Sequence, residues 1–261
     1  MYDLAALDAA LTGTLFAGKL HFSPVTGSTN TDALGAARSG AQHGSVYFAD
    51  EQHAGRGRGD HAWQSAAGQG LYVSVLLRPE IPVARLPLLP LAAGLAAVEA
   101  VSKSSGLEVD LRWPNDLMIA KRKTGGILVE SKIENGQVSF AVVGIGINVH
   151  QRAFDLGLAT PATSLDLETG RPISRQALLV SLLESLEREA ARLRESTAAT
   201  ALLKRVERAS TWIRERRVEV HGPQACTGLT EGLDAHGFLR VRTESGVVTV
   251  QTGGIRAAEI G

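Results

Sequence analysis

Two arginines in a glycine-rich segment are the first residues that indicate chemistry. Arg56 and Arg58 alternate with glycines in the run Gly55-Arg56-Gly57-Arg58-Gly59. Glycine lets the backbone adopt positive φ and approach a ligand closely, and arginine stays charged at physiological pH. The pattern therefore suits a phosphate or another anion. A glycine-rich linker would have the same composition, so the linker interpretation stays open at this stage.

A second group of cations and glycines lies further along the chain. Lys121, Arg122 and Lys123 precede Gly125 and Gly126, after which an apolar, strand-like run begins. The chain has 27 Lys and Arg against 27 Asp and Glu, so any attraction for an anion must be local. A solvated basic turn would look the same, but cations in two glycine-containing connections favour an anion site.

Two clusters of polar residues allow both a structural and a functional interpretation. Ser28, Thr29 and Asn30 are common N-cap residues, and a helical pattern follows them. The alternative is that they bind a polar ligand group at the helix N-terminus. Asn115 and Asp116 follow a proline, where Asx turns are common, and they are also candidate ligand-binding groups.

Composition predicts a soluble, cytoplasmic protein. The chain has 261 residues, 44% of them hydrophobic, which is enough for a packed core. Its single cysteine, Cys226, excludes an intrachain disulfide, and no cleavable apolar N-terminus is visible. No apolar run approaches the roughly 18 to 20 residues needed to cross a bilayer. The longest, residues 86–101, is alanine-rich and interrupted by prolines, so we expect no membrane partner.

Hydrophobic periodicity predicts helices, strands and a domain boundary near Arg216. Helices are expected within residues 1–20 and at residues 33–40, 86–101, 174–193 and 198–215, and strands at residues 46–49, 71–77, 107–113 and 140–149. The glycine-rich segment then connects the first two strands. From Arg217 onward, valines alternate with polar residues, as in a small antiparallel barrel. We therefore divide the chain into residues 1–215 and 216–261.

Five motifs together resemble the biotin protein ligases in order and spacing over residues 20–150. They are the Gly27-Ser28-Thr29-Asn30 turn, the Glu51-Gln52-x-Ala54-Gly55-Arg56-Gly57-Arg58 loop with Trp63 after it, Arg112-Trp113-Pro114-Asn115-Asp116-Leu117, Lys123-x-Gly125-Gly126-Ile127-Leu128 and Gly144-Ile145-Gly146-Ile147-Asn148. The resemblance implies an α+β fold. A mixed or antiparallel sheet packed with helices, as in class II aminoacyl-tRNA synthetases and biotin and lipoate ligases, would precede a small SH3-like β-barrel.

The resemblance also implies a two-step reaction. Biotin and ATP would give biotinyl-5′-AMP and pyrophosphate. A lysine of a biotin carboxyl carrier domain, of acetyl-CoA carboxylase or a related carboxylase, would then attack the mixed anhydride. Two anions meet in the first step, so cations in a dry site would lower its barrier. Mg²⁺ would neutralise the triphosphate, and no covalent enzyme intermediate is required.

Carried over residue by residue, the motifs predict the site. The predicted catalytic residues are Lys123, Arg58 and Arg56. The predicted biotin-binding residues are Ser28, Thr29, Asn30, Gln52, Gly55, Arg56, Trp63, Lys123, Gly125, Gly126 and Ile127. The predicted ATP and adenylate contacts are Arg56, Arg58, Trp63, Asn115, Lys123 and Asn148. Asp116 is the expected magnesium ligand.

The sequence departs from the family pattern in two places. Gly59, Asp60, His61 and Ala62 occupy positions where the family often carries further basic residues, and Arg112 stands where lysine is common. The first change predicts weaker nucleotide binding or a less rigid closed loop. The second preserves charge but changes hydrogen-bond geometry.

The chain ends and sheet edges suggest which partners to expect. Residues 1–20 precede the motifs, too few for the winged-helix DNA-binding domain that some members carry, so we expect no DNA partner and no repressor role. An exposed edge strand at residues 137–143 could pair in a homodimer or dock the carrier.

Three other functions stay open. The same general fold supports lipoate and octanoate ligases or transferases, although Ser28, Thr29 and Gln52 favour a ureido ring over an acyl chain. A non-catalytic adenylate sensor or carrier-binding module would keep the apolar pocket but would not need Lys123 or the loop arginines. A nucleic-acid-binding barrel is the third, and zero net charge counts against it.

Overall fold

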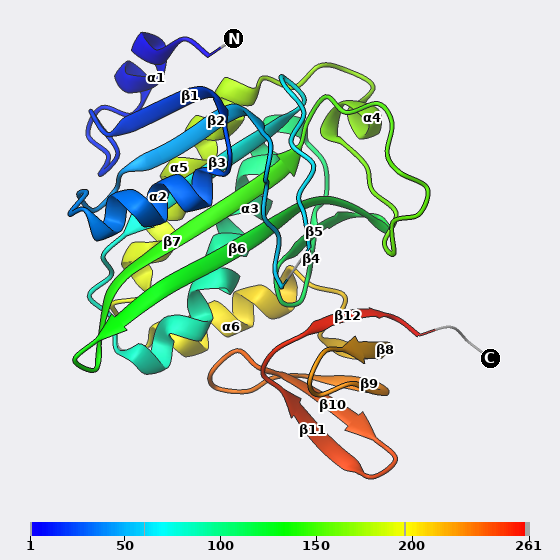
Figure 1. Ribbon diagram of the computed structural model, residues 1–261. Helices are drawn as coiled ribbons and strands as arrows, with labels where there is room; N and C mark the ends of the chain where they lie inside the picture. Colours follow the sequence, from blue (N-terminus) through cyan, green and yellow to red (C-terminus); the bar gives the residue numbers. More distant parts are fainter. Residues whose placement is uncertain (1, 60, 196, 259–261) are drawn as a thin grey trace.

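The computed structural model describes residues 2–59, 61–195 and 197–258, which form a helix-covered seven-stranded sheet and a separate five-stranded sheet (Figure 1). The helices are α1 (Leu4–Ala10), α2 (Thr29–Arg38), the 3-10 helix η1 (Val83–Leu88), α3 (Leu89–Ser105), α4 (Leu165–Thr169), α5 (Arg175–Arg192) and α6 (Ala198–Arg208). The strands of the larger sheet are β1 (Leu20–Thr26), β2 (Val46–Gln52), β3 (Gly70–Leu77), β4 (Asp110–Arg112), β5 (Asp116–Ile119), β6 (Arg122–Glu134) and β7 (Gln137–Asn148). Those of the smaller sheet are β8 (Arg214–His221), β9 (Cys226–Leu233), β10 (Leu239–Thr243), β11 (Gly246–Val250) and β12 (Gly254–Ala257). The predicted α+β class is confirmed.

The larger sheet is mixed and has the strand order β1-β2-β3-β7-β6-β5-β4. β1 and β2 run parallel, and every other neighbouring pair is antiparallel. α2 connects β1 to β2, because a parallel pair needs a crossover connection. The glycine-rich segment, residues 53–69, connects β2 to β3, so both of its ends are anchored in the sheet.

Helices pack on both faces of this sheet (Figure 1). On one face, α3 packs between the sheet and α5, and Val75 and Leu77 of β3 belong to the same apolar cluster as α3. On the other face, α2 packs over Leu76, Phe140 and Val142. Neighbouring residues of one strand thus enter different clusters, as the alternation of side chains in a strand requires.

β6 and β7 form a long hairpin in the middle of the sheet. Their turn is Asn135-Gly136, with φ values of 51° and 73°, which suits a two-residue hairpin turn. The prediction of an edge strand at residues 137–143 is wrong, because residues 141–147 pair with β3 on one side and β6 on the other. Only residues 137–140 extend past the end of β3. The edges of this sheet are β1 and β4.

α3 is the buried helix that we expected at residues 86–101, shifted by a few residues. Pro87 lies in η1 and Pro90 in the first turn of α3, where proline is tolerated. Together η1 and α3 span Val83–Ser105, which by length and a mean hydropathy of 1.5 is apolar enough to cross a membrane. The expectation that no run approaches this length is therefore wrong. In the fold the helix packs against the larger sheet, α5 and α6, as the core helix of a globular domain does.

The smaller sheet is antiparallel throughout, with the order β11-β10-β9-β8-β12. It confirms the expected small β unit after α6. The helix predicted at residues 198–215 is too long, since α6 ends at Arg208 and β8 begins at Arg214. The boundary predicted near Arg216 therefore falls at the start of β8.

The two sheets share one apolar core. Trp113, in the turn between β4 and β5, donates a hydrogen bond from Nε1 to the carbonyl of Gly237 (3.0 Å), in the β9–β10 connection. Gly237 has a φ of 83°, and a Cβ there would lie 2.7 Å from Leu91 Cδ1 of α3. Glycine therefore lets the β9–β10 connection of the smaller sheet pack directly against α3.

Candidate active site

Two cavities meet beside the glycine-rich segment. The first is narrow, about 50 Å³, and lies between the N-terminus of α2 and strands β3, β6 and β7. The second, about 990 Å³, lies between the larger sheet, residues 151–162 and the smaller sheet. The residues that line both cavities are Gly57, Arg58, Trp63, Asn115 and Lys123. One ligand can therefore extend from the first cavity into the second past these side chains.

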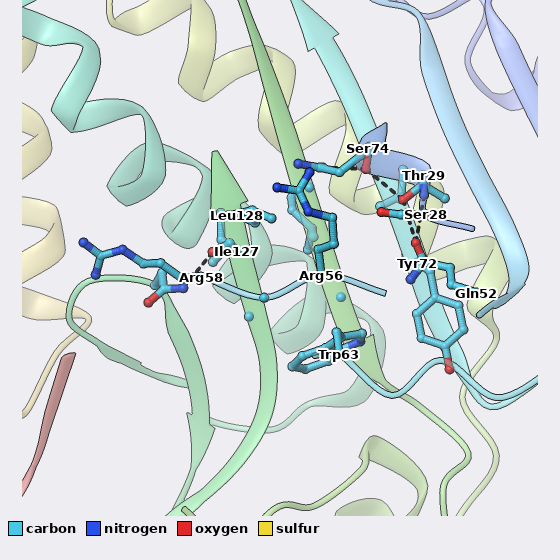
Figure 2. A pocket seen from close by; sticks show the side chains of 18 of the residues that line it. Ser28, Thr29, Gln52, Arg56, Arg58, Trp63, Tyr72, Ser74, Ile127 and Leu128 are labelled. Atoms are coloured by element: carbon cyan, nitrogen blue, oxygen red, sulfur yellow. Dashed lines mark hydrogen bonds between the residues drawn. The ribbon is translucent and has the colours of Figure 1, made fainter. Parts of the chain in front are cut away.

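Uncharged side chains form the closed end of the first cavity (Figure 2). The backbone N–H of Thr29 donates to Gln52 Oε1 (2.9 Å), and the Thr29 hydroxyl lies 2.8 Å from that of Ser74. Ser74 donates to Asn30 Oδ1 (2.8 Å), and Gln52 Nε2 donates to Ser65 Oγ (2.7 Å). These bonds fix donors and acceptors in place, which recognition of a polar ring requires.

The N-cap residue of α2 does not cap the helix with its own side chain, and Gln52 Oε1 accepts the first helical N–H, that of Thr29, instead. Ser28 occupies the N-cap position with extended backbone angles, but its hydroxyl makes no capping hydrogen bond. Ser28 is 3% exposed and lines the first cavity. Of the two interpretations of this motif, the structure favours a ligand-facing group over a helix cap.

Glycines of β6 and β7 let the cavity walls lie directly on strand backbones. A Cβ on Gly144 would lie 2.2 Å from Asn30 Oδ1, and one on Gly146 would lie 2.6 Å from Trp63 Nε1. A Cβ on Gly126 would be 3.5 Å from both Trp63 and the Lys123 ammonium. The Trp63 ring therefore lies against the strand backbone, at the junction of the two cavities.

A partly buried carboxylate joins two cations at the junction. Asp116, the first residue of β5, accepts Lys123 Nζ on Oδ1 at 2.5 Å and Arg112 Nη2 on Oδ2 at 2.6 Å. Burial disfavours the charged form, but the two cations outweigh it and lower the pKa of Asp116 below its ordinary value. Lys123 Nζ also lies 5.5 Å from the centre of the Trp63 ring. These contacts hold the ammonium between the two cavities.

The segment after β7 holds the backbone of Lys123. The Lys123 N–H donates to Pro161 O (2.8 Å), and the Thr163 N–H donates to Lys123 O (2.9 Å). Asn148 Nδ2 donates to the carbonyl of Thr163 (3.0 Å). Asn148, predicted as an ATP contact, thus fixes this segment as well as lining the second cavity.

Arg56 and Arg58 leave the glycine-rich segment in different directions (Figure 2). Arg58 donates to the carbonyl of Gly253 and to Thr252 Oγ1 (2.9 Å), both in the smaller sheet unit. Burial lowers the pKa of the Arg58 guanidinium, and the charge of Asp116 opposes this. The smaller sheet therefore holds one of the two arginines and forms a wall of the second cavity.

Arg56 binds Glu130 of β6 through both ends of its guanidinium. Nη1 and Nη2 each donate to a different carboxylate oxygen at 2.9 Å. Asn30 Nδ2 donates to the same carboxylate at 2.7 Å. The charge of Arg56 is therefore paired with a residue that the motifs did not single out.

Most predicted site residues line the cavities. Those at the first cavity are Ser28, Thr29, Asn30, Gln52, Arg56, Arg58, Trp63, Asn115, Lys123, Gly126 and Ile127, and Asn148 and Asp116 line the second. Gly55 and Gly125 line neither. A Cβ on Gly55 would meet Trp63 O at 2.3 Å, and one on Gly125 would meet Gly146 O at 2.9 Å, so both allow close packing. Asp60 lies outside the described residues.

Several residues of the first cavity were not predicted from the sequence. They are Gly57, Tyr72, Val73, Ser74, Leu128, Gly144, Ile145 and Gly146. Ser74 is a polar residue inside the apolar run of β3, and a buried polar group in such a run is the signal that could have identified it. Glu130, the partner of Arg56, is likewise a charged residue that directly follows an apolar run, Ile127-Leu128-Val129.

The sequence matches the Biotin/lipoate A/B protein ligase family over residues 22–148, which supply the lining of the first cavity. It is 38% identical over 171 residues to the bifunctional ligase/repressor BirA of Bacillus spizizenii. That match covers 65% of this chain and 53% of that protein, so the chain spans about half of that relative's length. It is 35% identical over 236 residues to the biotin--[acetyl-CoA-carboxylase] ligase of Mycobacterium tuberculosis, covering 88% of this chain and 85% of that protein. The chain belongs to the biotin protein ligases.

A solved biotin protein ligase is similar over nearly the whole chain. The enzyme of Aquifex aeolicus, in complex with biotin and ATP, matches with a TM-score of 0.78 and 28% identity. The match covers 92% of this chain and 98% of that chain, so it extends over both sheets. The biotin protein ligase fold implied by the five motifs is thereby confirmed.

Proposed function

We propose that this protein is an ATP-dependent biotin protein ligase. It activates biotin as biotinyl-5′-AMP with release of pyrophosphate and then transfers the biotinyl group to a lysine of a carrier domain. The junction of the two cavities carries this proposal, because Lys123 and Arg58 lie between a narrow polar pocket and a cavity of nucleotide size. A carboxylate in the first cavity and an α-phosphate in the second meet at these cations.

Lys123 acts in the adenylation step. The biotin carboxylate attacks the α-phosphorus, and the bond from that phosphorus to the pyrophosphate oxygen breaks. Negative charge increases on the phosphoryl oxygens, and a preorganised cation in a dry site stabilises it. An ammonium is a compact charge with three donors, so it can bridge an acyl and a phosphoryl oxygen. Asp116 holds the ammonium at 2.5 Å and so positions it for this role.

The transfer step uses the amine of the carrier as its nucleophile. The amine nitrogen attacks the acyl carbon of biotinyl-5′-AMP, an amide bond forms, and AMP leaves. Cys226, the one cysteine in the chain, lies on β9 and lines neither cavity. The step therefore proceeds without an enzyme thiol. Closing of the glycine-rich segment over bound biotinyl-5′-AMP would exclude water and limit hydrolysis of the anhydride.

Magnesium fits this site as part of the nucleotide substrate, and the contacts of Asp116 do not fit a metal ligand. Both of its carboxylate oxygens already accept cationic donors, from Lys123 and Arg112. Over the residues that the structure describes, no group of three His, Cys, Asp or Glu side chains is placed to hold a metal ion. We therefore assign Mg²⁺ to the triphosphate and give Asp116 the task of orienting Lys123.

The closed end of the first cavity supports biotin as the acid. Thr29, Gln52 and Ser74 offer hydrogen-bonding groups there, whereas the acyl chain of octanoate or lipoate has no polar group to bond with them. A non-catalytic binding module would not need the cations at the junction.

The partner follows from the same reaction. The relative from Mycobacterium tuberculosis is named as a ligase of acetyl-CoA carboxylase, so we propose the biotin carboxyl carrier domain of that or a related carboxylase as the acceptor. We also propose a cytoplasmic location and no DNA partner, on the single cysteine and the zero net charge. Homodimerisation stays a prediction, for which β1 and β4 are the sheet edges.

Exchange of pyrophosphate into ATP tests the proposal. The protein with Mg²⁺ is assayed in parallel with biotin, lipoate, octanoate and no acid. Exchange that depends on biotin alone is the expected result. Exchange with lipoate or octanoate would keep the mechanism and overturn the assigned substrate. Binding of biotin without any exchange would replace the ligase with a binding module.

A further inference from the structure

We propose that Glu130 is a positioning residue for Arg56, and that its carboxylate and the carboxylate of the substrate compete for the same guanidinium. The inference rests on the proposed function for the identity of the ligand. Its basis is the contact geometry, because Glu130 uses both oxygens on both terminal nitrogens of Arg56 at 2.9 Å. Glu130 therefore occupies the end-on edge of the guanidinium, and a substrate carboxylate that binds this same edge must displace it.

A hydrogen-bond chain connects Glu130 to the groups at the closed end of the pocket. Asn30 donates to Glu130 at 2.7 Å, and Ser74 donates to Asn30 at 2.8 Å. The Ser74 hydroxyl lies 2.8 Å from that of Thr29. The orientation of the Glu130 carboxylate is thus set by the same buried network that forms the proposed ring site.

Glu130 lies far from the reaction centre. On β6, Gly126 and Leu128 line the first cavity, and Glu130 follows them on the same face of the strand. Seven residues separate it from Lys123, which corresponds to about 20 Å of extended strand. Figure 2 shows the Arg56 side chain extending towards Ser74 and Thr29, away from Arg58. In this position Arg56 lies across the closed end of the pocket and not beside the cations of the junction.

The size of the pocket indicates that this arrangement must change when a ligand enters. The first cavity is about 50 Å³, and ligand pockets are usually roughly 300 Å³ or larger. Arg56 is exposed and is held by side-chain contacts, so rotation about its own bonds can free it. Gly57, the next residue, lines both cavities, so the released guanidinium is within reach of the junction. The carboxylate of the incoming substrate then replaces that of Glu130 on the Arg56 guanidinium. Because a neutral analogue cannot make this ion pair, the site binds an acid more tightly than the analogue.

Binding of biotin and of biotinol, in which a neutral hydroxymethyl group replaces the carboxylate, tests the proposal by calorimetry. Glu130→Gln keeps the shape of the side chain and removes its charge, so biotin should bind about three- to tenfold more tightly, in line with a partly exposed ion pair. Biotinol should bind within twofold of its wild-type affinity. Glu134→Gln, an exposed glutamate at the end of the same strand, is the matched control and should change neither affinity.

Two further variants separate competition from support of the pocket. Arg56→Gln should reduce the preference for biotin over biotinol to the part that Lys123 and Arg58 supply. Adding Glu130→Gln to it should then have no further effect on the ratio of the two affinities. Glu130→Asp keeps the charge and should retain a ratio within about twofold of wild type.

Three results would overturn the proposal. If the ratio of biotin affinity to biotinol affinity is unchanged in Glu130→Gln, Glu130 does not compete with the substrate carboxylate. If both affinities fall equally, the role of Glu130 is only to hold Asn30 in place. Wild-type protein that binds neither ligand would overturn the proposed function as well, so the two failures are distinguishable.

Discussion

The closed end of the first cavity and its junction with the second are built in different ways. At the closed end, Thr29, Asn30 and Ser74 are uncharged, no more than 5% exposed and bonded to one another. At the junction, Lys123 is charged, its side chain is 28% exposed, and it is paired with a carboxylate of the protein. In the proposed mechanism, recognition of the ring rests on fixed neutral groups, whereas the adenylation step rests on charges that partner groups hold in place.

The largest effect is expected at the junction. Lys123→Ala removes the cation that stabilises the phosphoryl oxygens, so kcat for pyrophosphate exchange should fall about 10²- to 10³-fold. The Kd for biotin should stay within about threefold, since the ring is bound at the other end. Lys121→Ala is the control, because Lys121 is exposed and lines neither cavity. Unchanged exchange in Lys123→Ala would falsify the role of this residue.

Substitution of Arg58 should affect the binding of biotinyl-5′-AMP more than the binding of biotin. Arg58→Ala should weaken retention of biotinyl-5′-AMP about 10- to 30-fold and biotin by less than about threefold, because a charged donor at the phosphate is lost. Dissociation of the two ligands is measured by rapid dilution. Thr252→Val removes one neutral partner of Arg58 and should have a smaller effect. Equal losses for both ligands would show that Arg58 does not distinguish the ends of the site.

A substitution at the closed end should show the opposite pattern. Ser74→Ala breaks the bonds to Thr29 and Asn30, so the affinity for biotin should fall about tenfold while kcat at saturating biotin stays within about twofold. The steady-state KM and kcat of exchange measure this. Ser45→Ala removes another buried hydroxyl, bonded to Gln42 O and away from both cavities, and should change neither value. A fall in kcat without a change in KM would contradict the division between the two ends.

The smallest effect concerns stability and pH. The pKa of Asp116 is lowered in the folded state, so its carboxylate stabilises the fold above the unfolded pKa of about 3.9 and loses this contribution as pH falls through the folded pKa. The free energy of urea unfolding should be about 1 kcal/mol higher for wild type than for Asp116→Asn. This is below the range for fully buried pairs, because Lys123 is 28% exposed and the asparagine oxygen can still accept from Arg112. This difference in unfolding free energy should be constant from about pH 8 to 5 and decrease below about pH 4. Asp155→Asn, at an exposed position, is the control, and a difference that already shrinks near pH 7 would contradict the ion cluster.

Much of the fold and site was predictable from local patterns. Apolar periodicity located α5 and the start of α6, since one buried stripe per helix is a local property. The motifs around Arg58, Lys123 and Gly146 identified residues that do lie together at the junction. The pattern could not show that β7 lies inside the sheet, because strand neighbours are set by long-range pairing.

The sequence by itself determined which chemical groups are present, in what order, and in which kind of local structure. Only the tertiary structure decided which groups meet. Arg56 and Glu130 are separated by 74 residues and Arg58 and Thr252 by 194, yet each pair is in contact. Such contacts depend on strand register and on the docking of the second sheet, which no short segment specifies. The sequence therefore shows which charged residues are present, but not which of them form ion pairs or hydrogen bonds with one another.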